Sequence, residues 1–263
     1  MDTIRRGCLK PVHVVSPCPS RFHWTSAAAT DLGRARQINE DAYLDRPDLG
    51  LWAVADGMGG HAAGDVASRM VAQALETMPP PVFLGQAAFD LRCRLSDANR
   101  QLRAEATRRG KRIIGSTVAV LLALGGHCVL LWAGDSRIYR LHRGLLRRLS
   151  HDHSQVEELV EQGLLAREAA ELHPAANIVT RAVGADDEIE VDAQIYPLEN
   201  GDRFLLCTDG LTKEIPEREI PPVLSRGTAR DNAEMLVRNA CERGAKDNVT
   251  SVVVHFSTGE ELR

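Results

Sequence analysis

Aromatic residues are scarce in this 263-residue sequence, because Phe, Trp and Tyr together make up only 4% of it. A core built from such a chain must be mostly aliphatic, and an aromatic-rich platform for stacking single-stranded nucleic acid is not expected. The formal net charge is −4, the hydrophobic fraction is 44%, and the glycines and prolines follow no repeat. Intrinsic disorder, collagen and coiled coils are therefore excluded, and an ordinary globular protein remains.

The sequence also lacks the signals of secretion and of membrane insertion. Its six cysteines form no C-x-x-C pair, which favours reduced thiols in a cytosol. Arg5 and Arg6 are followed by a lysine, a histidine and three prolines instead of the apolar run of a signal peptide. The longest apolar stretches, residues 117–124 and 128–133, are far shorter than the roughly 20 residues of a membrane helix. We therefore expect a cytoplasmic protein with no membrane partner.

One folded domain is expected after a short N-terminal arm. Residues 1–25 contain three prolines and little periodicity, which indicates a loosely ordered arm. No Pro-, Gly- or Ser-rich linker follows, so residues 26–258 are expected to form a single domain. Short apolar runs predict strands at 51–55, 117–124, 128–133, 138–141, 204–207 and 251–256, and helical spacing predicts helices at 61–78, 87–109, 155–162 and 229–243.

Helix ends and one turn carry signals of their own. Ser154 and Glu157 have the spacing of a capping box, and Thr228 and Gly244 bound the last helix in a similar way. Gly125-Gly126 predicts a tight hairpin between two strands. Hairpins with long helices between the strand groups favour mixed α and β layers over a strictly parallel sheet.

Acidic residues stand at the ends of the apolar strands. Asp56, Asp135 and Asp209 each close one, and Asp247 stands just before the last strand. A single acid in such a place is commonly a turn former. If these strand ends lie together, the carboxylates raise one another's pKa unless cations neutralise them. Hard divalent ions held by oxygen ligands are the natural counter-ions.

A second group of polar residues, Arg36 with Glu40 and Asp41, suggests what such ions would do. Beside a metal-carboxylate site, an arginine offers a planar fork that matches a phosphate. Two metal ions roughly 3.5–4 Å apart can share a bridging water, lower its pKa and aim it in line at phosphorus. The set therefore predicts phosphate-ester hydrolysis by a bridging hydroxide, with no nucleophile from the protein.

The motifs that carry these residues stand in one order: Gly33–Ala42, Asp56–His61, Gly115–Thr117, Gly134–Tyr139, Thr208–Thr212 and Asp247–Thr250. Together they resemble the signature of the bacterial branch of protein phosphatase 2C, the PPM family of metal-dependent serine/threonine phosphatases. Residues 152–154 and 177–184 resemble the flap of those enzymes. The resemblance covers about residues 26–256.

The resemblance implies an α+β fold, a four-layer sandwich of two antiparallel β-sheets flanked by α-helices. It also implies that Asp56 bridges two Mn²⁺ or Mg²⁺ ions and that Gly57 offers its carbonyl to one of them. Asp209 and Asp247 would bind the second ion, with Glu40 acting through water.

Three further roles follow from the same resemblance. Arg36 would bind the substrate phosphate, and Asp41 would orient water in the metal shell. Asp135, together with Asp209, corresponds to positions that hold a third ion in bacterial members. The flap residues His153, Ser154 and Arg181 are our hypothesis for substrate selection.

Met58 stands where animal members commonly have a histidine that is proposed as general acid. A thioether cannot supply a proton, so protonation of the leaving group is unassigned. His61 is another candidate for this role, with a structural role at the helix start as the favoured alternative.

Other functions have less support in the sequence than this one. His151 and His153 stand at strand spacing with His173 nearby, which invites a zinc interpretation, but no Cys or third His stands at zinc-finger spacing. The basic segment 91–112 suits either a solvated helix face or an anionic polymer, whose binding would depend on salt. A P-loop or kinase is excluded by the missing motifs. A phosphoprotein-binding scaffold with a vestigial site is the remaining alternative, and it would bind no Mn²⁺.

The sequence therefore predicts a monomeric phosphatase that removes phosphate from serine or threonine of proteins. Its expected partners are phosphorylated proteins and a Ser/Thr kinase acting on the same substrates, without nucleic acid.

Overall fold

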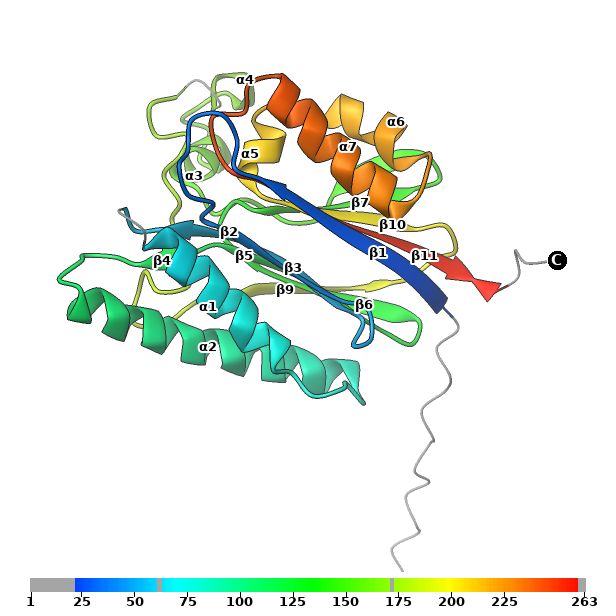
Figure 1. Ribbon diagram of the computed structural model, residues 1–263, viewed down its shortest axis with the longest axis horizontal. Coiled ribbons are helices and arrows are strands. Elements are labelled where there is room, and N and C mark those ends of the chain that lie inside the picture. Colours follow the sequence, from blue (N-terminus) through cyan, green and yellow to red (C-terminus); the bar gives the residue numbers. More distant parts are fainter. Residues whose placement is uncertain (1–21, 61–62, 171–172, 260–263) are drawn as a thin grey trace, which may run out of the picture.

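Two antiparallel sheets form the centre of the protein, which is a computed structural model that describes residues 22–60, 63–170 and 173–259 (Figure 1). The first sheet has the spatial order β1 (Phe22–Asp31), β11 (Val249–Thr258), β10 (Arg203–Cys207), β7 (Arg137–His142) and β8 (Leu145–Arg148). The second has the order β2 (Asp41–Arg46), β3 (Leu51–Met58), β5 (Val118–Leu124), β6 (His127–Ala133) and β9 (Asp192–Pro197), with the short β4 (Gly115–Ser116) on β3.

Helices cover the outer face of each sheet (Figure 1). Those packed on the second sheet are α1 (Gly64–Glu76) and α2 (Leu84–Arg108). The first sheet is covered by α5 (Asp209–Thr212), α6 (Ile220–Leu224), which follows the 3₁₀ turn Glu217–Glu219, and α7 (Ala229–Glu242). Two short helices, α3 (Gln155–Glu161) and α4 (Arg167–Ala170), lie in the flap between β8 and β9. The predicted four-layer sandwich is confirmed.

Strands that are buried on both faces explain why the sequence shows continuous apolar runs instead of a polar alternation. In β11, Val252, Val254 and Phe256 point between the sheets, whereas Val249 and Val253 point toward α7. Several of the scarce aromatic residues gather between the sheets. Trp24, Trp52, Phe204 and Phe256 lie edge to face there, with ring centroids 5.6–6.0 Å apart. The two outer cores are almost entirely aliphatic, as expected.

The strands that the sequence did not reveal lie at sheet edges or are polar. Strand β1 pairs with β11 over its whole length, from Phe22 with Thr258 to Asp31 with Val249. It starts at Phe22, so the expected arm was too long: residues 22–25 belong to the sheet, because their alternating side chains complete the intersheet core. Strands β2, β8 and β9 were also missed, and β9 exposes most of its side chains. Residues 1–21 lie outside the described part.

The predicted turn and helix ends are close to those observed. Gly125-Gly126 joins β5 to β6, with Leu124 opposite His127 and Gly125 at φ +62°. A reciprocal capping box joins Thr228 to Asp231 at the start of α7. Ser154 caps α3 by accepting the amide of Glu157, but the Glu157 carboxylate accepts from Arg167 instead of closing the box.

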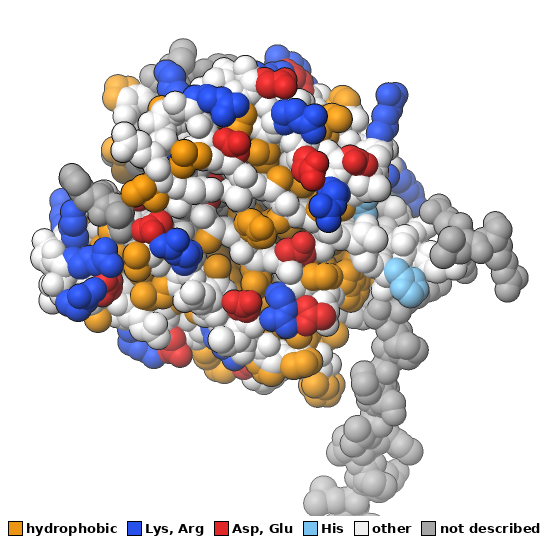
Figure 2. Space-filling view, viewed as in Figure 1, with side chains coloured by type: hydrophobic (Ala, Val, Ile, Leu, Met, Phe, Trp, Pro, Cys, Tyr) orange, Lys and Arg blue, Asp and Glu red, His pale blue; other side chains and the backbone are white. Residues whose placement is uncertain are grey.

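Acidic and basic side chains are interspersed over the face that carries β1 and α7 (Figure 2). The basic helix α2 is likewise balanced by acids, because Arg100 pairs with Asp97, Arg103 with Asp187, and Arg108 and Arg109 with Glu105. This arrangement favours the solvated-face interpretation of segment 91–112. None of the helices within the described ranges combines the length and apolarity that a membrane crossing requires.

Candidate active site

Strand ends from both sheets meet at one end of the sandwich and bring five aspartates together. Asp41 and Asp56 are direct cross-strand neighbours on β2 and β3 of the second sheet. Asp135 follows β6 of the same sheet, while Asp209 follows β10 and Asp247 precedes β11 of the first sheet. Each of Asp41, Asp56 and Asp135 has its pKa raised by burial and by the charge of others in the group. The predicted acid cluster is therefore present.

Asp41 is the most enclosed of these acids, at 9% exposed. Its Oδ2 accepts hydrogen bonds from the hydroxyls of Thr208 (2.8 Å) and Thr250 (2.7 Å), which come from the first sheet. Its Oδ1 has no partner. Burial raises the pKa of Asp41 to about 7, although the two hydroxyls act in the opposite direction. One carboxylate oxygen is thus fixed in place and the other is left free for a ligand.

Asp56 and Asp135 are both buried beside other acids, and the backbone of Asp56 is tied to Thr117. The amide of Asp56 donates to the Thr117 hydroxyl (3.0 Å), which is also 2.7 Å from the hydroxyl of Ser136. Burial, followed by the charge of Asp41, holds the pKa of Asp56 well above its usual value. Burial, followed by the charge of Asp209, raises the pKa of Asp135 to about 7. This concentration of carboxylates is unfavourable without added positive charge.

Asp209 and Asp247 face positive side chains. Arg36 forms an ion pair with both oxygens of Asp247: Nη2 donates to Oδ2 (3.0 Å), and Nε lies 2.9 Å from Oδ1. Lys213 Nζ contacts Asp209 Oδ2 and lies 3.8 Å from Asp247 Oδ2. Asp209 Oδ1 is buried without a partner. Two cations of the protein therefore stand at the carboxylates that were predicted to hold the second ion.

Glu40 and Gly57 lie against the start of α1, where close backbone packing excludes larger residues. Glu40 Oε1 accepts the amide of Gly64 (3.1 Å), and the Gly57 amide donates to the carbonyl of Glu40 (3.0 Å). A Cβ on Gly57 would lie 1.9 Å from the Gly64 carbonyl oxygen, and one on Gly64 would lie 2.6 Å from the Gly57 carbonyl oxygen. Glycine is thus required at both positions, and only small groups fit beside the Gly57 carbonyl.

The loop that carries Arg36 is tied to the start of β11. Asn248 donates to the carbonyls of Leu32 (2.9 Å) and Ile38 (3.2 Å) and accepts the Glu40 amide (2.8 Å). Gly33 has φ +77°, and a Cβ there would lie 2.1 Å from the Asp247 carbonyl oxygen. The position of Arg36 opposite Asp247 is therefore fixed by the backbone.

The donor set fits divalent metal ions on its chemistry. It consists of carboxylate oxygens and a carbonyl, the ligands that Mn²⁺ and Mg²⁺ accept. Two of the buried oxygens without a partner, Asp41 Oδ1 and Asp209 Oδ1, belong to it; the others in the described residues are Asp65 Oδ1 and Thr180 Oγ1. Within the same ranges, no three acidic, His or Cys side chains are already gathered as a metal cage. Arg36 and Lys213 instead interleave with the carboxylates.

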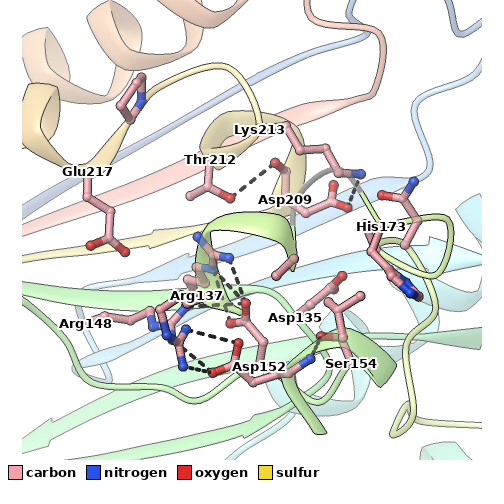
Figure 3. Close-up of a pocket in the computed structure, with 17 residues that line it drawn as sticks. Asp135, Arg137, Arg148, Asp152, Ser154, His173, Asp209, Thr212, Lys213 and Glu217 are labelled. Carbon is pink, nitrogen blue, oxygen red and sulfur yellow. Dashed lines mark hydrogen bonds and ion pairs between the residues drawn. The ribbon is translucent and has the colours of Figure 1, made fainter. Parts of the chain in front are cut away.

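A cavity of about 880 Å³ opens beside Asp135 and Asp209, between the first sheet and the flap (Figure 3). Asp152, only 7% exposed, holds one wall by accepting from Arg137 (2.7 Å from Nη2) and from Arg148 (3.4 Å). A smaller cavity of about 380 Å³ is lined by Arg36 and Asp247. Lys213 lines both cavities.

The three predicted flap residues are placed differently. Ser154 lines the 880 Å³ cavity. His153 is buried, stacks on Trp132 with ring centroids 6.4 Å apart, and accepts the Gly134 amide at Nδ1 (3.1 Å). Its proton is therefore on Nε2, 3.3 Å from Asp192 Oδ2. Arg181 Nη1 also lies 3.3 Å from Asp192, so these two residues meet away from the cavity lining.

The zinc hypothesis receives no support from the histidines. His151 faces Glu157 and Glu161, whereas His153 faces Asp192.

Met58, which stands where animal members commonly have the proposed general acid, lies at the end of β3 opposite Gly115 of β4. His61 lies outside the described residues.

Sequence reasoning missed the side chains that position the acids. Thr208, Thr250 and Thr117 orient Asp41 and Asp56 through their hydroxyls. The signal for Thr208 and Thr250 was available, since both stand in motifs beside an acid. Lys213, four residues after Asp209 and hence on the same side of a helical turn, was also missed.

Comparison with known proteins agrees with this geometry. The protein phosphatase 2C family model matches residues 33–247. The serine/threonine phosphatase stp of Listeria monocytogenes is 35% identical over 237 residues, which cover 86% of this chain and 93% of the relative. The chain belongs to the protein phosphatase 2C family and is a metal-dependent phosphoprotein phosphatase.

Solved structures share both the fold and part of the sequence. PppA, described as a key regulatory component of the type VI secretion system (T6SS) in Pseudomonas aeruginosa, has a TM-score of 0.83 and 43% identity, with 88% of this chain and 97% of that chain covered. The catalytic domain of the phosphatase PstP, in complex with two manganese ions, has a TM-score of 0.78 and 32% identity, covering 90% and 99%.

Proposed function

We propose that this protein hydrolyses phosphoserine and phosphothreonine on proteins at a dinuclear metal centre formed by the strand-end acids. The observation that carries the proposal is the meeting of five aspartates from two sheets, with unpaired buried oxygens on Asp41 and Asp209. Asp56, Asp209, Asp247 and the Gly57 carbonyl would hold two Mn²⁺ or Mg²⁺ ions, Glu40 would act through water, and Asp135 with Asp209 would hold a third. When bound, such ions lower the pKa of a water molecule and neutralise phosphate charge.

Arg36 is the residue we assign to the substrate phosphate. Its side chain is 47% exposed and opens on the 380 Å³ cavity while its fork faces Asp247. The hydrogen bond to Asp247 raises the pKa of the guanidinium above its already high value. Burial acts in the opposite direction, but the charges of Asp247 and of the nearby acids Glu40 and Asp56 raise the pKa further, so Arg36 remains charged. A planar charged fork next to carboxylates that bind cations is suited to holding a phosphate in one orientation.

Asp41 is the residue we assign to orienting the attacking water. Thr208 and Thr250 fix one of its oxygens, which leaves Oδ1 available as an acceptor at a defined position. A fixed acceptor of this kind restricts the attacking water to one orientation. Met58 supplies no proton, and the acid for the leaving group stays unassigned.

We further propose that the flap, including His153, Ser154 and Arg181, selects the substrate protein. The partner expected from this function is a Ser/Thr kinase that phosphorylates the same proteins, and we expect the phosphatase to act as a cytoplasmic monomer. Replacing Arg181 by Ala should alter the ratio of rates on phosphopeptides of different sequence, while the rate on a small aryl phosphate stays the same. Equal losses on both would argue against a selective role.

The experiment that tests the function measures phosphate release from a phosphothreonine peptide with Mn²⁺ present. We expect turnover by the wild type and a loss of at least about 100-fold for Asp209→Asn. Asp97→Asn on the exposed face of α2 is the matched control and should retain the wild-type rate. A near-normal rate for Asp209→Asn, with the circular dichroism spectrum unchanged, would refute the assignment of the metal centre.

A further inference from the structure

Lys213 places a tethered positive charge where the second metal ion is proposed to bind. It follows α5, and its ammonium group reaches back to the carboxylate of Asp209, four residues earlier (Figure 3). The same ammonium is 3.8 Å from Asp247 Oδ2. Lys213 therefore joins the two carboxylates that our proposed function assigns to the second ion.

The surroundings hold the ammonium in this place. Burial lowers the pKa of Lys213, but Asp209, Asp247 and Asp135 outweigh it and leave the pKa raised, so the charge is stabilised by three members of the acid group. On the other side of Asp247, the fork of Arg36 occupies the same carboxylate. The result is an alternating row of charges, Arg36, Asp247, Lys213 and Asp209, with no free carboxylate between the two cations.

A divalent ion and the ammonium cannot share this position. Both are cations, and an ion held by Asp209 and Asp247 would lie next to the ammonium, which contacts Asp209 Oδ2 and is 3.8 Å from Asp247 Oδ2. Two unit charges about 4 Å apart interact appreciably even near a protein surface, and a divalent ion doubles the repulsion. Binding of the second ion therefore requires Lys213 to leave.

We propose that Lys213 is a built-in competitor of the second metal ion, which holds Asp209 and Asp247 together without metal and is displaced when Mn²⁺ or Mg²⁺ binds. The inference rests on the proposed dinuclear site. It predicts that the protein keeps its acid cluster assembled at low metal concentration and that its second ion binds more weakly than the carboxylates alone would allow.

The test is isothermal titration calorimetry of the metal-free protein with Mn²⁺. We expect Lys213→Met to lower the dissociation constant of the weaker site about tenfold, which corresponds to about 1.4 kcal/mol. Lys213→Gln, which keeps a hydrogen-bonding group without the charge, should also lower the dissociation constant of the weaker site. Lys213→Arg keeps the charge and should stay close to the wild type.

Lys246→Met is the matched control, because Lys246 is an exposed lysine that lines the same 380 Å³ cavity. It should change the dissociation constant by less than about twofold, well below one tenfold step. Unfolding temperatures give a second readout: in EDTA the Lys213→Met protein should unfold below the control, and saturating Mn²⁺ should raise its unfolding temperature by more than it raises that of the control.

The outcomes separate the two proposals. If the wild type binds Mn²⁺ but Lys213→Met and Lys213→Gln bind it equally well or more weakly, the competitor role is overturned while the proposed metal centre stands. If the wild type takes up no Mn²⁺ at all, the metal centre itself is wrong, and the inference about Lys213 falls with it.

Discussion

Replacing Asp41 by Asn should stabilise the metal-free protein at neutral pH while abolishing its activity. The pKa of Asp41 is raised from 3.8 to about 7, mainly by burial. The folded state therefore binds more protons than the unfolded state across this interval, and the free energy of unfolding falls as the pH rises from about 4 to 7. A pKa shift of about 3 units lowers the free energy of unfolding at neutral pH by at most about 4 kcal/mol.

Asparagine removes this loss because its amide carries no charge. Its carbonyl oxygen can still accept from Thr208 and Thr250, and its NH₂ group faces the neighbouring carboxylates instead of repelling them. We expect the metal-free Asp41→Asn protein to be about 2 kcal/mol more stable than the wild type at pH 7 and to show a flatter pH profile.

The assay is urea unfolding in EDTA at several pH values between 4 and 8, repeated with Mn²⁺. Bound Mn²⁺ should remove most of the pH dependence of the wild-type free energy of unfolding, since the ions neutralise the same carboxylates. Asp97→Asn, at an exposed position, should follow the wild-type profile. The reasoning is refuted if the metal-free wild type gains stability from pH 4 to 7, or if Asp41→Asn has the same slope as the wild type.

Three further changes test the supports of the site by urea unfolding. Arg137→Met leaves Asp152 buried beside the more distant Arg148 and should lower the free energy of unfolding by about 3 kcal/mol. Arg147→Met, at an exposed position, should lower it little. Equally small effects of the two changes would contradict the importance of the buried pair. Gly33→Ala should lower the free energy of unfolding by about 2 kcal/mol and reduce activity, because its Cβ would lie 2.1 Å from the Asp247 carbonyl oxygen. Gly85→Ala has open space around its Cβ and should be neutral or stabilising. An active and stable Gly33→Ala protein would disprove the close approach. Thr250→Val removes one hydrogen bond to Asp41, so it should lower the free energy of unfolding by about 1–2 kcal/mol and slow the reaction. An unchanged rate would argue against an orienting role for Thr250.

The sequence predicted the buried strands and the acid cluster because both follow from local patterns. Strands such as β6 and β11 are largely apolar on both faces, and an aspartate stands just after β6 and just before β11, where the chain leaves or enters the core. Long amphipathic helices such as α7 were found for the same reason, with Thr228 marking the start and Gly244 the end.

The remaining features depend on partners far apart in the chain. After Trp24, strand β1 has small and polar side chains, and its pairing with β11 makes this stretch a strand. The hydroxyls of Thr208 and Thr250 reach Asp41 across 167 and 209 residues of sequence. Glu157 looked like half of a capping box, but Arg167 offered its carboxylate a charged partner. No local pattern contains these contacts.

The position of β11 within the first sheet affects when the protein can become active during synthesis. This strand lies between β1 and β10, and it brings Asp247 and Thr250 to the acid cluster. Until residues 249–258 are available, β1 has no neighbour in its sheet, and Asp41 lacks one of its two hydroxyl partners. Completion of the sheet and of the site therefore coincide, so a nascent chain that stops short of β11 should neither fold stably nor dephosphorylate any protein.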